Sequence, residues 1–177
     1  MIIGIFDFEM SNLNADFGMM LCGVVKEFRG DAQTFRLDQY DLYKKDRAND
    51  RVLAKDLRDA LEEFDIWVSY NGRRFDIPFL NSRLLFHGLR PIEKKKHIDL
   101  LYQARYKLKL HSSRLASVQE HLGLSNKKTE IRGYHWTRAL AGYKPSMDYI
   151  VRHCVLDVAV LEETYGKLKQ FVTVIYA

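Results

Sequence analysis

The sequence predicts an α/β domain in which a mixed β-sheet is flanked by helices. Three apolar runs joined by short turns come first, and connections of a few residues allow only antiparallel pairing between neighbouring strands. Helical patterns, with one more buried apolar run between them, fill the remainder of the chain. A length of 177 residues, of which 47% are hydrophobic, is enough for a sizeable core, so we expect residues 1–177 to form a single domain.

The first part of the chain carries three strands in succession. The first is the apolar run at residues 1–6, which leads into Asp7 and Glu9. The second covers residues 19–28, and the third covers residues 33–37 after an Arg-Gly-Asp turn. We therefore expect an antiparallel meander.

Periodicity and helix-stop residues predict the elements that follow. Apolar residues three and four apart favour a helix over residues 50–63, and the apolar run at 65–70 favours a buried strand. A helix over residues 77–87 is expected to end at Gly88. Further helices are predicted over residues 100–106, 114–122 and 147–169.

Charge and composition limit the classes of protein. Lys and Arg number 28 against 23 Asp and Glu, and the net charge of +5 is a modest indication of a polyanionic partner. No apolar run approaches the ~18 residues of a membrane span, and the first residues lack a basic leader, so we expect no membrane protein and no signal peptide. Cys22 and Cys154 have apolar neighbours and are predicted to be reduced core thiols, which favours a cytoplasmic setting.

Asp7 and Glu9 form the first segment that indicates chemistry. Residues two apart in a strand point to the same side, so both carboxylates project together. Two like charges this close repel unless something positive lies between them, and a divalent cation with oxygen ligands would do so. The alternative is a pair of solvated acids beyond a strand end.

Asp76 follows the predicted buried strand, within the segment NGRRFDIPFL at residues 71–80. Pro78 fits the first turn of a helix, where its missing N–H is tolerated. The alternative role of Asp76 is that of the helix N-cap. Asp76 can serve in a site as well only if its carboxylate faces the edge of the sheet.

His153 and Asp157 lie four residues apart on an otherwise apolar predicted helix, so they share one face. A buried carboxylate without a partner takes up a proton or costs stability. The alternative is a His–Asp pair that stabilises the core.

In this order, the three acidic segments resemble the three motifs of the DEDD superfamily of 3′–5′ exonucleases, which has a ribonuclease H-like fold. The matching segments are FDFE at residues 6–9, residues 71–80 and HCVLDV at residues 153–158. HIDL at residues 97–100 and the segment 115–122 also look like this superfamily. The resemblance covers nearly the whole chain and is closest to the proofreading domain of family B DNA polymerases and related stand-alone exonucleases. It implies a five-stranded mixed sheet whose first three strands are antiparallel.

The resemblance also implies the catalytic residues: Asp7, Glu9, Asp76, His153 and Asp157. The four carboxylates would hold two Mg²⁺ or Mn²⁺ ions. Asp7 would bridge both ions, Glu9 and Asp157 would serve the ion that binds the attacking water, and Asp76 would reach the other. Such an ion pair activates the water and neutralises charge at the leaving oxygen. The implied reaction is 3′–5′ hydrolysis of single-stranded nucleic-acid ends, DNA favoured over RNA, to nucleoside monophosphates.

The third motif departs from both subgroups of that superfamily. One subgroup carries a His five residues before the last Asp, and the other carries a Tyr four residues before it. Here these positions hold Arg152 and His153. Because an imidazole titrates near neutrality, we expect His153 to orient or deprotonate the attacking water. Tyr149, one turn earlier on the same face, is the reserve candidate and is expected near the substrate.

Further residues are expected to bind the substrate. Near the terminal nucleotide we expect Met10, Ser11, Asn12 and Leu13, with Leu13 as an apolar wedge; Asn71 and Phe75 are expected beside the penultimate nucleotide. Lys128 and Trp136 belong to a basic stretch with interspersed rings, the combination that binds phosphates and unpaired bases. We interpret Lys94 to Lys96 instead as solvated surface.

Two other functions are compatible with these residues. One is a non-catalytic nucleic-acid-binding module, and the other is a structure-selective endonuclease, both on the same fold. The expected partners are the 3′ ends of single-stranded DNA or RNA and a replication or repair protein, with no membrane. The chain is expected to be a monomer.

Overall fold

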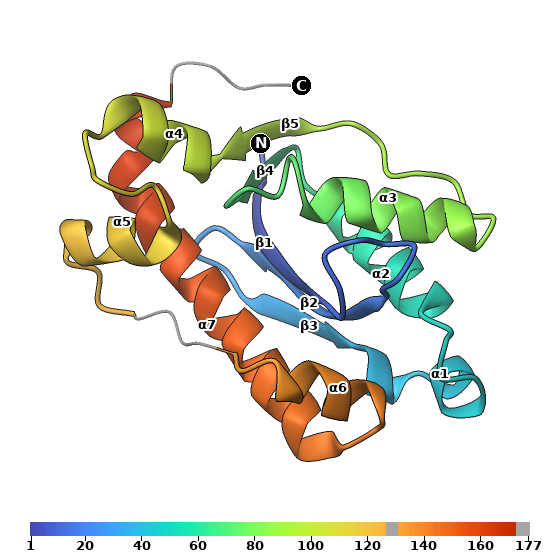
Figure 1. The fold of residues 1–177 in the computed structure, drawn as a ribbon. Helices are drawn as coiled ribbons and strands as arrows, with labels where there is room; N and C mark the ends of the chain where they lie inside the picture. The colour runs from blue at the N-terminus through green and yellow to red at the C-terminus, as the bar shows by residue number, and fades with distance from the viewer. Residues whose placement is uncertain (127–130, 173–177) are drawn as a thin grey trace.

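The protein is described by a computed structural model that covers residues 1–126 and 131–172. A five-stranded sheet with the order β3-β2-β1-β4-β5 forms its centre (Figure 1). The strands are β1 (Ile3–Met10), β2 (Met20–Glu27), β3 (Ala32–Arg36), β4 (Ile66–Ser69) and β5 (Lys96–Asp99). The first three strands pair antiparallel, whereas β4 runs parallel to β1 and to β5. The predicted mixed sheet with an antiparallel meander is confirmed.

Helices cover both faces of this sheet (Figure 1). On one face, Leu57 of α2 (Arg51–Glu62) lies against Gly23 and Phe8. On the other face, Cys154 of the long helix α7 (Lys144–Leu168) contacts the backbone of Asp7. The other helical segments are η1 (Leu37–Gln39), α1 (Asp41–Lys45), α3 (Asp76–Phe86), α4 (Leu100–Lys107), α5 (Leu115–Leu122), α6 (Tyr134–Leu140) and η2 (Lys169–Phe171). None of the helices in the described part of the chain has the length and apolar character for crossing a membrane.

The two edges of β1 are paired over different lengths. One edge pairs with β2 as far as Met10, with a register shift between Glu9 and Met10. The other edge pairs with β4 only from Ile3 to Ile5. Beyond that point Phe8 donates its backbone N–H to Oδ1 of Asp76, at 3.2 Å. The first residue of α3 therefore accepts a hydrogen bond from the part of the β1 edge that β4 does not pair with.

This contact corrects one interpretation of Asp76. The position before α3 is Phe75, which makes no side-chain capping hydrogen bond, and Asp76 is already helical. The suggestion that Asp76 is the N-cap is therefore wrong, because its carboxylate turns toward the sheet and accepts a hydrogen bond from the backbone N–H of Phe8 in β1. Asp7 and Glu9 also lie inside β1 rather than beyond its end.

Candidate active site

Asp7 and Glu9 lie on the face of β1 that α7 covers. They alternate with Phe8, whose ring lies on the opposite face near Leu57. Cys154 in α7 donates its thiol proton to the carbonyl oxygen of Asp7, at 3.1 Å. Burial raises the pKa of the Cys154 thiol well above its usual range, so the thiol stays protonated and remains a donor. This contact holds the third motif directly against the first.

His153 lies between two of the predicted carboxylates. Its Nε2 is 3.5 Å from Oε1 of Glu9 and 3.4 Å from Oδ2 of Asp157. The side chains are 6%, 13% and 3% exposed, respectively, so the group is shielded from solvent apart from the Glu9 side. The four-residue spacing on α7 thus brings His153 and Asp157 together as predicted, and it adds Glu9 from the strand.

Asp76 approaches the same stretch of β1 from α3. Its side chain is 5% exposed, and its hydrogen bond reaches the backbone of Phe8, between Asp7 and Glu9. Two helices therefore bring acidic side chains to one short stretch of strand: α7 across its face and α3 along its edge. The parallel strands β1, β4 and β5 have their carboxyl ends on this side of the sheet. Open α/β folds bind their ligands at the carboxyl ends of the strands.

The four carboxylates have the chemistry of a site for hard divalent cations, which prefer oxygen ligands. Across residues 1–126 and 131–172, however, no group of three or more His, Cys, Asp and Glu side chains is arranged to hold a metal ion by itself. Mg²⁺ is commonly held by one or two carboxylates, with water and phosphate oxygens completing its octahedron. The four carboxylates therefore match such a cation in the type of ligand that they offer.

A hollow of about 380 Å³ opens beside Glu9. It is lined by residues 8–13, Phe75 and Trp136. The structure thus brings together six of the predicted substrate-binding residues: Met10, Ser11, Asn12, Leu13, Phe75 and Trp136. Trp136 reaches the hollow from α6, a helix that the sequence analysis did not predict.

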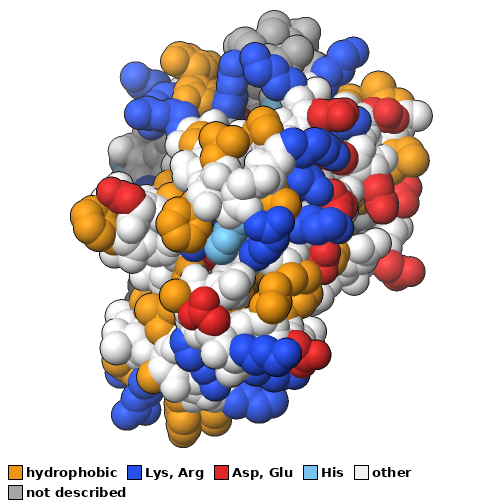
Figure 2. Space-filling model, turned by 90° about the vertical axis from the view of Figure 1, so that its right-hand side faces the viewer, with side chains coloured by type: hydrophobic (Ala, Val, Ile, Leu, Met, Phe, Trp, Pro, Cys, Tyr) orange, Lys and Arg blue, Asp and Glu red, His pale blue; other side chains and the backbone are white. Residues whose placement is uncertain are grey.

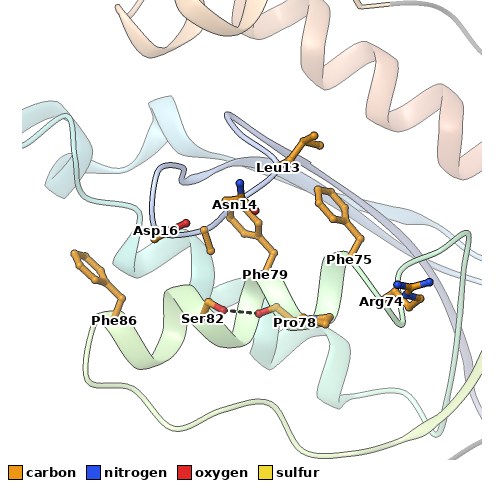
Figure 3. Close-up of a pocket in the computed structure, with 10 residues that line it drawn as sticks. Leu13, Asn14, Asp16, Arg74, Phe75, Pro78, Phe79, Ser82 and Phe86 are labelled. Atoms are coloured by element: carbon orange, nitrogen blue, oxygen red, sulfur yellow. Dashed lines mark hydrogen bonds between the residues drawn. The ribbon is translucent and has the colours of Figure 1, made fainter.

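A second hollow, of about 430 Å³, lies between the β1–β2 loop and α3 (Figure 3). Leu13 and Phe75 line both hollows and so form the ridge between them. Figure 3 shows Phe86 at one end of the second hollow and Arg74 at the other. Sequence reasoning did not assign Arg74 a role, although it stands in the second motif, two residues before Asp76.

The remaining predicted residues that the structure describes do not line the hollow beside Glu9. The backbone N–H of Asn71 donates to Asp99, and the ring of Tyr149 stacks on His135 of α6 with centroids 4.3 Å apart. Lys94 to Lys96 line a separate hollow with Met1 and Asp65, at the amino end of β4 and β5. Lys128 lies outside the described residues.

A buried ionic cluster beside the site was not predicted. Asp50 is fully buried, and it accepts hydrogen bonds from Arg83, from His87 and from the backbone of Met20. Arg83 also donates to the carbonyl oxygen of Ala15, at 3.2 Å. The cluster therefore ties α3 to the loop that carries Leu13. Its only sequence signal was the four-residue spacing of Arg83 and His87 on a predicted helix.

Comparison with known proteins agrees with this architecture. A sequence profile described as the RNase H superfamily matches residues 5–169. No curated protein matches the sequence. Among solved structures, the family B DNA polymerase from the hyperthermophilic archaeon Pyrobaculum calidifontis superposes with a TM-score of 0.73 at 20% identity, over 97% of this chain and 25% of that one. The chain thus spans about a quarter of the polymerase, which it resembles in fold. Because the profile covers nearly all of its length, the chain belongs to the RNase H superfamily.

Proposed function

We propose that this protein is a two-metal-ion 3′–5′ exonuclease. It would release nucleoside monophosphates from single-stranded ends, with DNA favoured over RNA. The observation that carries this proposal is the meeting of Glu9, His153 and Asp157 beside a hollow of about 380 Å³, with the carboxylate of Asp76 hydrogen-bonded to the backbone of Phe8, between Asp7 and Glu9. Membership of the RNase H superfamily and the fold match to a polymerase support a nuclease.

We assign the metal ions and the attacking water to different residues of the site. Asp7, Glu9, Asp76 and Asp157 would hold two Mg²⁺ or Mn²⁺ ions, which when bound would supply an activated water and neutralise charge on the phosphate. His153, 3.5 Å from Glu9, would orient that water and take up its proton. The shielding of His153 and Asp157 keeps both groups in an environment where electrostatic interactions are strong.

The ridge of Leu13 and Phe75 favours a single-stranded nucleic acid as the substrate. With the terminal nucleotide in the hollow beside Glu9, the preceding base would lie across the ridge, in the hollow of Figure 3. Leu13 is 78% exposed and Phe86 is 70% exposed, so apolar surface is available to bases. Stacking of bases on aromatic rings is insensitive to sequence. A base-paired end could not place neighbouring bases on both sides of the ridge.

The polymerase whose fold the chain matches is about four times as long as the matched region, since that region is 25% of its chain. Because the matched protein is a DNA polymerase, we include in the proposal a replication or repair protein as a partner that delivers unpaired 3′ ends.

An end-labelled strand tests the proposal. Single-stranded DNA and RNA labelled at the 5′ end are incubated with Mg²⁺, with Mn²⁺ or with a chelator, and the products are separated on a gel. We expect a ladder that begins one nucleotide below the full length, present with either metal and lost in chelator. Asp7→Ala should abolish the ladder while the variant stays folded, because it removes one of several like charges.

The matched control is Asp41→Asn, which changes an exposed carboxylate of α1 that is paired with Lys44. Its ladder should equal that of the wild type. Cleavage of a circular strand would replace the proposal with an endonuclease, and strand binding without any product would replace it with a non-catalytic module. Full activity of Asp7→Ala would contradict the metal assignment.

A further inference from the structure

The HIDL segment, which forms the end of β5 and the start of α4, has no role in the proposed chemistry. Its acid, Asp99, nevertheless accepts three backbone hydrogen bonds. Oδ1 accepts from the N–H of Asn71 at 2.8 Å and from that of Leu101 at 3.1 Å, and Oδ2 accepts from the N–H of Arg73 at 3.2 Å. Two of these donors belong to the turn between β4 and α3. The carboxylate of β5 therefore holds a turn that lies 26 to 28 residues earlier in the chain.

This turn has a conformation that needs support. Asn71 has a φ of 65°, in the left-handed region, which few residues other than glycine adopt and which Asn tolerates better than most. Gly72 follows, and a Cβ there would lie 2.5 Å from Oγ of Ser69, so only glycine allows the close approach. Ser69 is itself paired with Nε2 of His97, at 2.8 Å. His97 and Asp99 are two residues apart on β5. Asp99 therefore contacts the turn directly, and His97 contacts it through Ser69.

The turn leads directly into the candidate site. The N–H of Phe75 donates to the carbonyl of Asn71, and the N–H of Ile77 donates to that of Gly72, both at 3.0 Å. The first turn of α3, which carries Asp76, is therefore built on the turn that Asp99 holds. Asp99 is only 2% exposed, so water cannot replace its donors if the turn moves away. The hydrogen bonds to Asp99 therefore hold the backbone of the turn in one position.

We propose that Asp99 is a positioning residue for the proposed hydrolysis, fixing the 71–73 turn so that Asp76 reaches β1 and Phe75 forms the ridge. This inference rests on the proposed function for its kinetic part only. A displacement of about 1 Å in a catalytic group can reduce a rate by on the order of 10²-fold.

Two variants test the role. Asp99→Asn keeps one carbonyl oxygen for Asn71 and Leu101, but its amide then faces the N–H of Arg73, donor against donor. Asp99→Ala removes all three acceptor contacts. We expect hydrogen exchange at the Arg73 amide to rise about tenfold or more in Asp99→Asn, and at both Asn71 and Arg73 in Asp99→Ala. The turnover number should fall by about 10- to 100-fold, more in the alanine variant, and KM should rise by up to about tenfold in that variant, because Phe75 of the ridge is displaced as well.

Glu62→Gln is the matched control, because Glu62 also accepts a backbone N–H, from Glu93 at 2.9 Å, but stands at the end of α2. It should leave the turn amides and the turnover number unchanged. Binding of a single-stranded oligonucleotide in chelator gives a readout without activity, and Asp99→Ala should weaken it about tenfold. If the wild type proves inactive, the proposed function fails, while exchange and binding still decide the role of Asp99. Unchanged exchange and binding in both Asp99 variants would overturn the inference.

Discussion

At the residue scale, the position of His153 between two acids decides what it can do. Nε2 faces both Glu9 and Asp157, at 3.5 and 3.4 Å. Among side chains, imidazole is the one whose charge ordinarily changes near neutrality, which suits the proposed role of general base. The residue that departs from both patterns of the third motif is therefore the one that we propose as the base.

His153→Ala is expected to lower the rate of cleavage by about 10²–10⁴-fold, the usual contribution of a general base. Single-turnover cleavage of an end-labelled strand with saturating metal measures this rate. Tyr149→Phe is the matched variant, because it removes one hydroxyl and keeps the ring that stacks on His135. It should change the rate by less than about threefold. A loss under about threefold in His153→Ala would move the base role to Tyr149 or to solvent.

Residues that act through local spacing were predictable from the sequence. Asp7 with Glu9 follows from alternation in a strand, and His153 with Asp157 follows from one helical turn. The partners of Asp76 and Asp99 were not predictable, because they are backbone N–H groups 68 and 28 residues away. Such contacts depend on where two elements meet. Sequence reasoning therefore found the acids, but it could not tell which of them hold the fold together.

At the element scale, β5 is the strand that residue patterns alone did not predict, and only the family resemblance implied a fifth strand. It has four residues, Lys96–Asp99, and the last three are buried although two of them are polar. So short a run shows neither alternation nor an apolar stretch. The helices α1 and α6, with five and seven residues, are equally short, and their sequences carry no periodic stripe. The long elements, by contrast, were predicted within a few residues of their bounds.

The buried His97 of β5 makes a pH-dependent contribution to stability. Burial lowers its pKa from 6.5 to about 4. Between these two values the unfolded chain binds a proton that the folded chain does not, so the free energy of unfolding rises with pH through this window. This stabilisation is fully present above about pH 6.5 and is lost as the pH falls toward 4, to the extent of about 3 kcal/mol at most.

Urea unfolding of the wild type and of His97→Gln from pH 4 to 8 measures this contribution. The difference in the free energy of unfolding between the two proteins should grow from pH 4 to 6.5 and then become constant. Burial raises the pKa of Asp99, which acts in the opposite sense near the acid end, but this contribution is common to both proteins. A difference independent of pH would show that His97 titrates alike in the folded and unfolded chains.

At the scale of the whole molecule, the positions of the charged side chains indicate more about nucleic-acid binding than the net charge of +5 does. Lys94 to Lys96 lie at the amino end of β4 and β5, away from the candidate site, which agrees with their interpretation as solvated surface. Arg74, in contrast, lines the hollow that Leu13 and Phe75 separate from the site. On the face in Figure 2, hydrophobic side chains reach the surface beside Lys and Arg side chains. The proposed path of a strand across the ridge of Leu13 and Phe75 therefore relies on Arg74 and not on Lys94 to Lys96.

The salt dependence of strand binding separates the two kinds of cation. For a single strand, the logarithm of the association constant falls with the logarithm of salt concentration with a slope of about −0.7 per neutralised phosphate. If Arg74 contacts one phosphate, Arg74→Gln should make the slope less negative by about 0.7 and weaken binding. Lys94→Gln, with the same loss of charge at the opposite end of the sheet, should leave the slope unchanged. Fluorescence anisotropy of a labelled oligonucleotide in chelator, from 50 to 200 mM salt, gives both slopes. Equal slopes for the two variants would mean that the molecule attracts the strand through its net charge alone, and the path across the ridge of Leu13 and Phe75 would lose its electrostatic support.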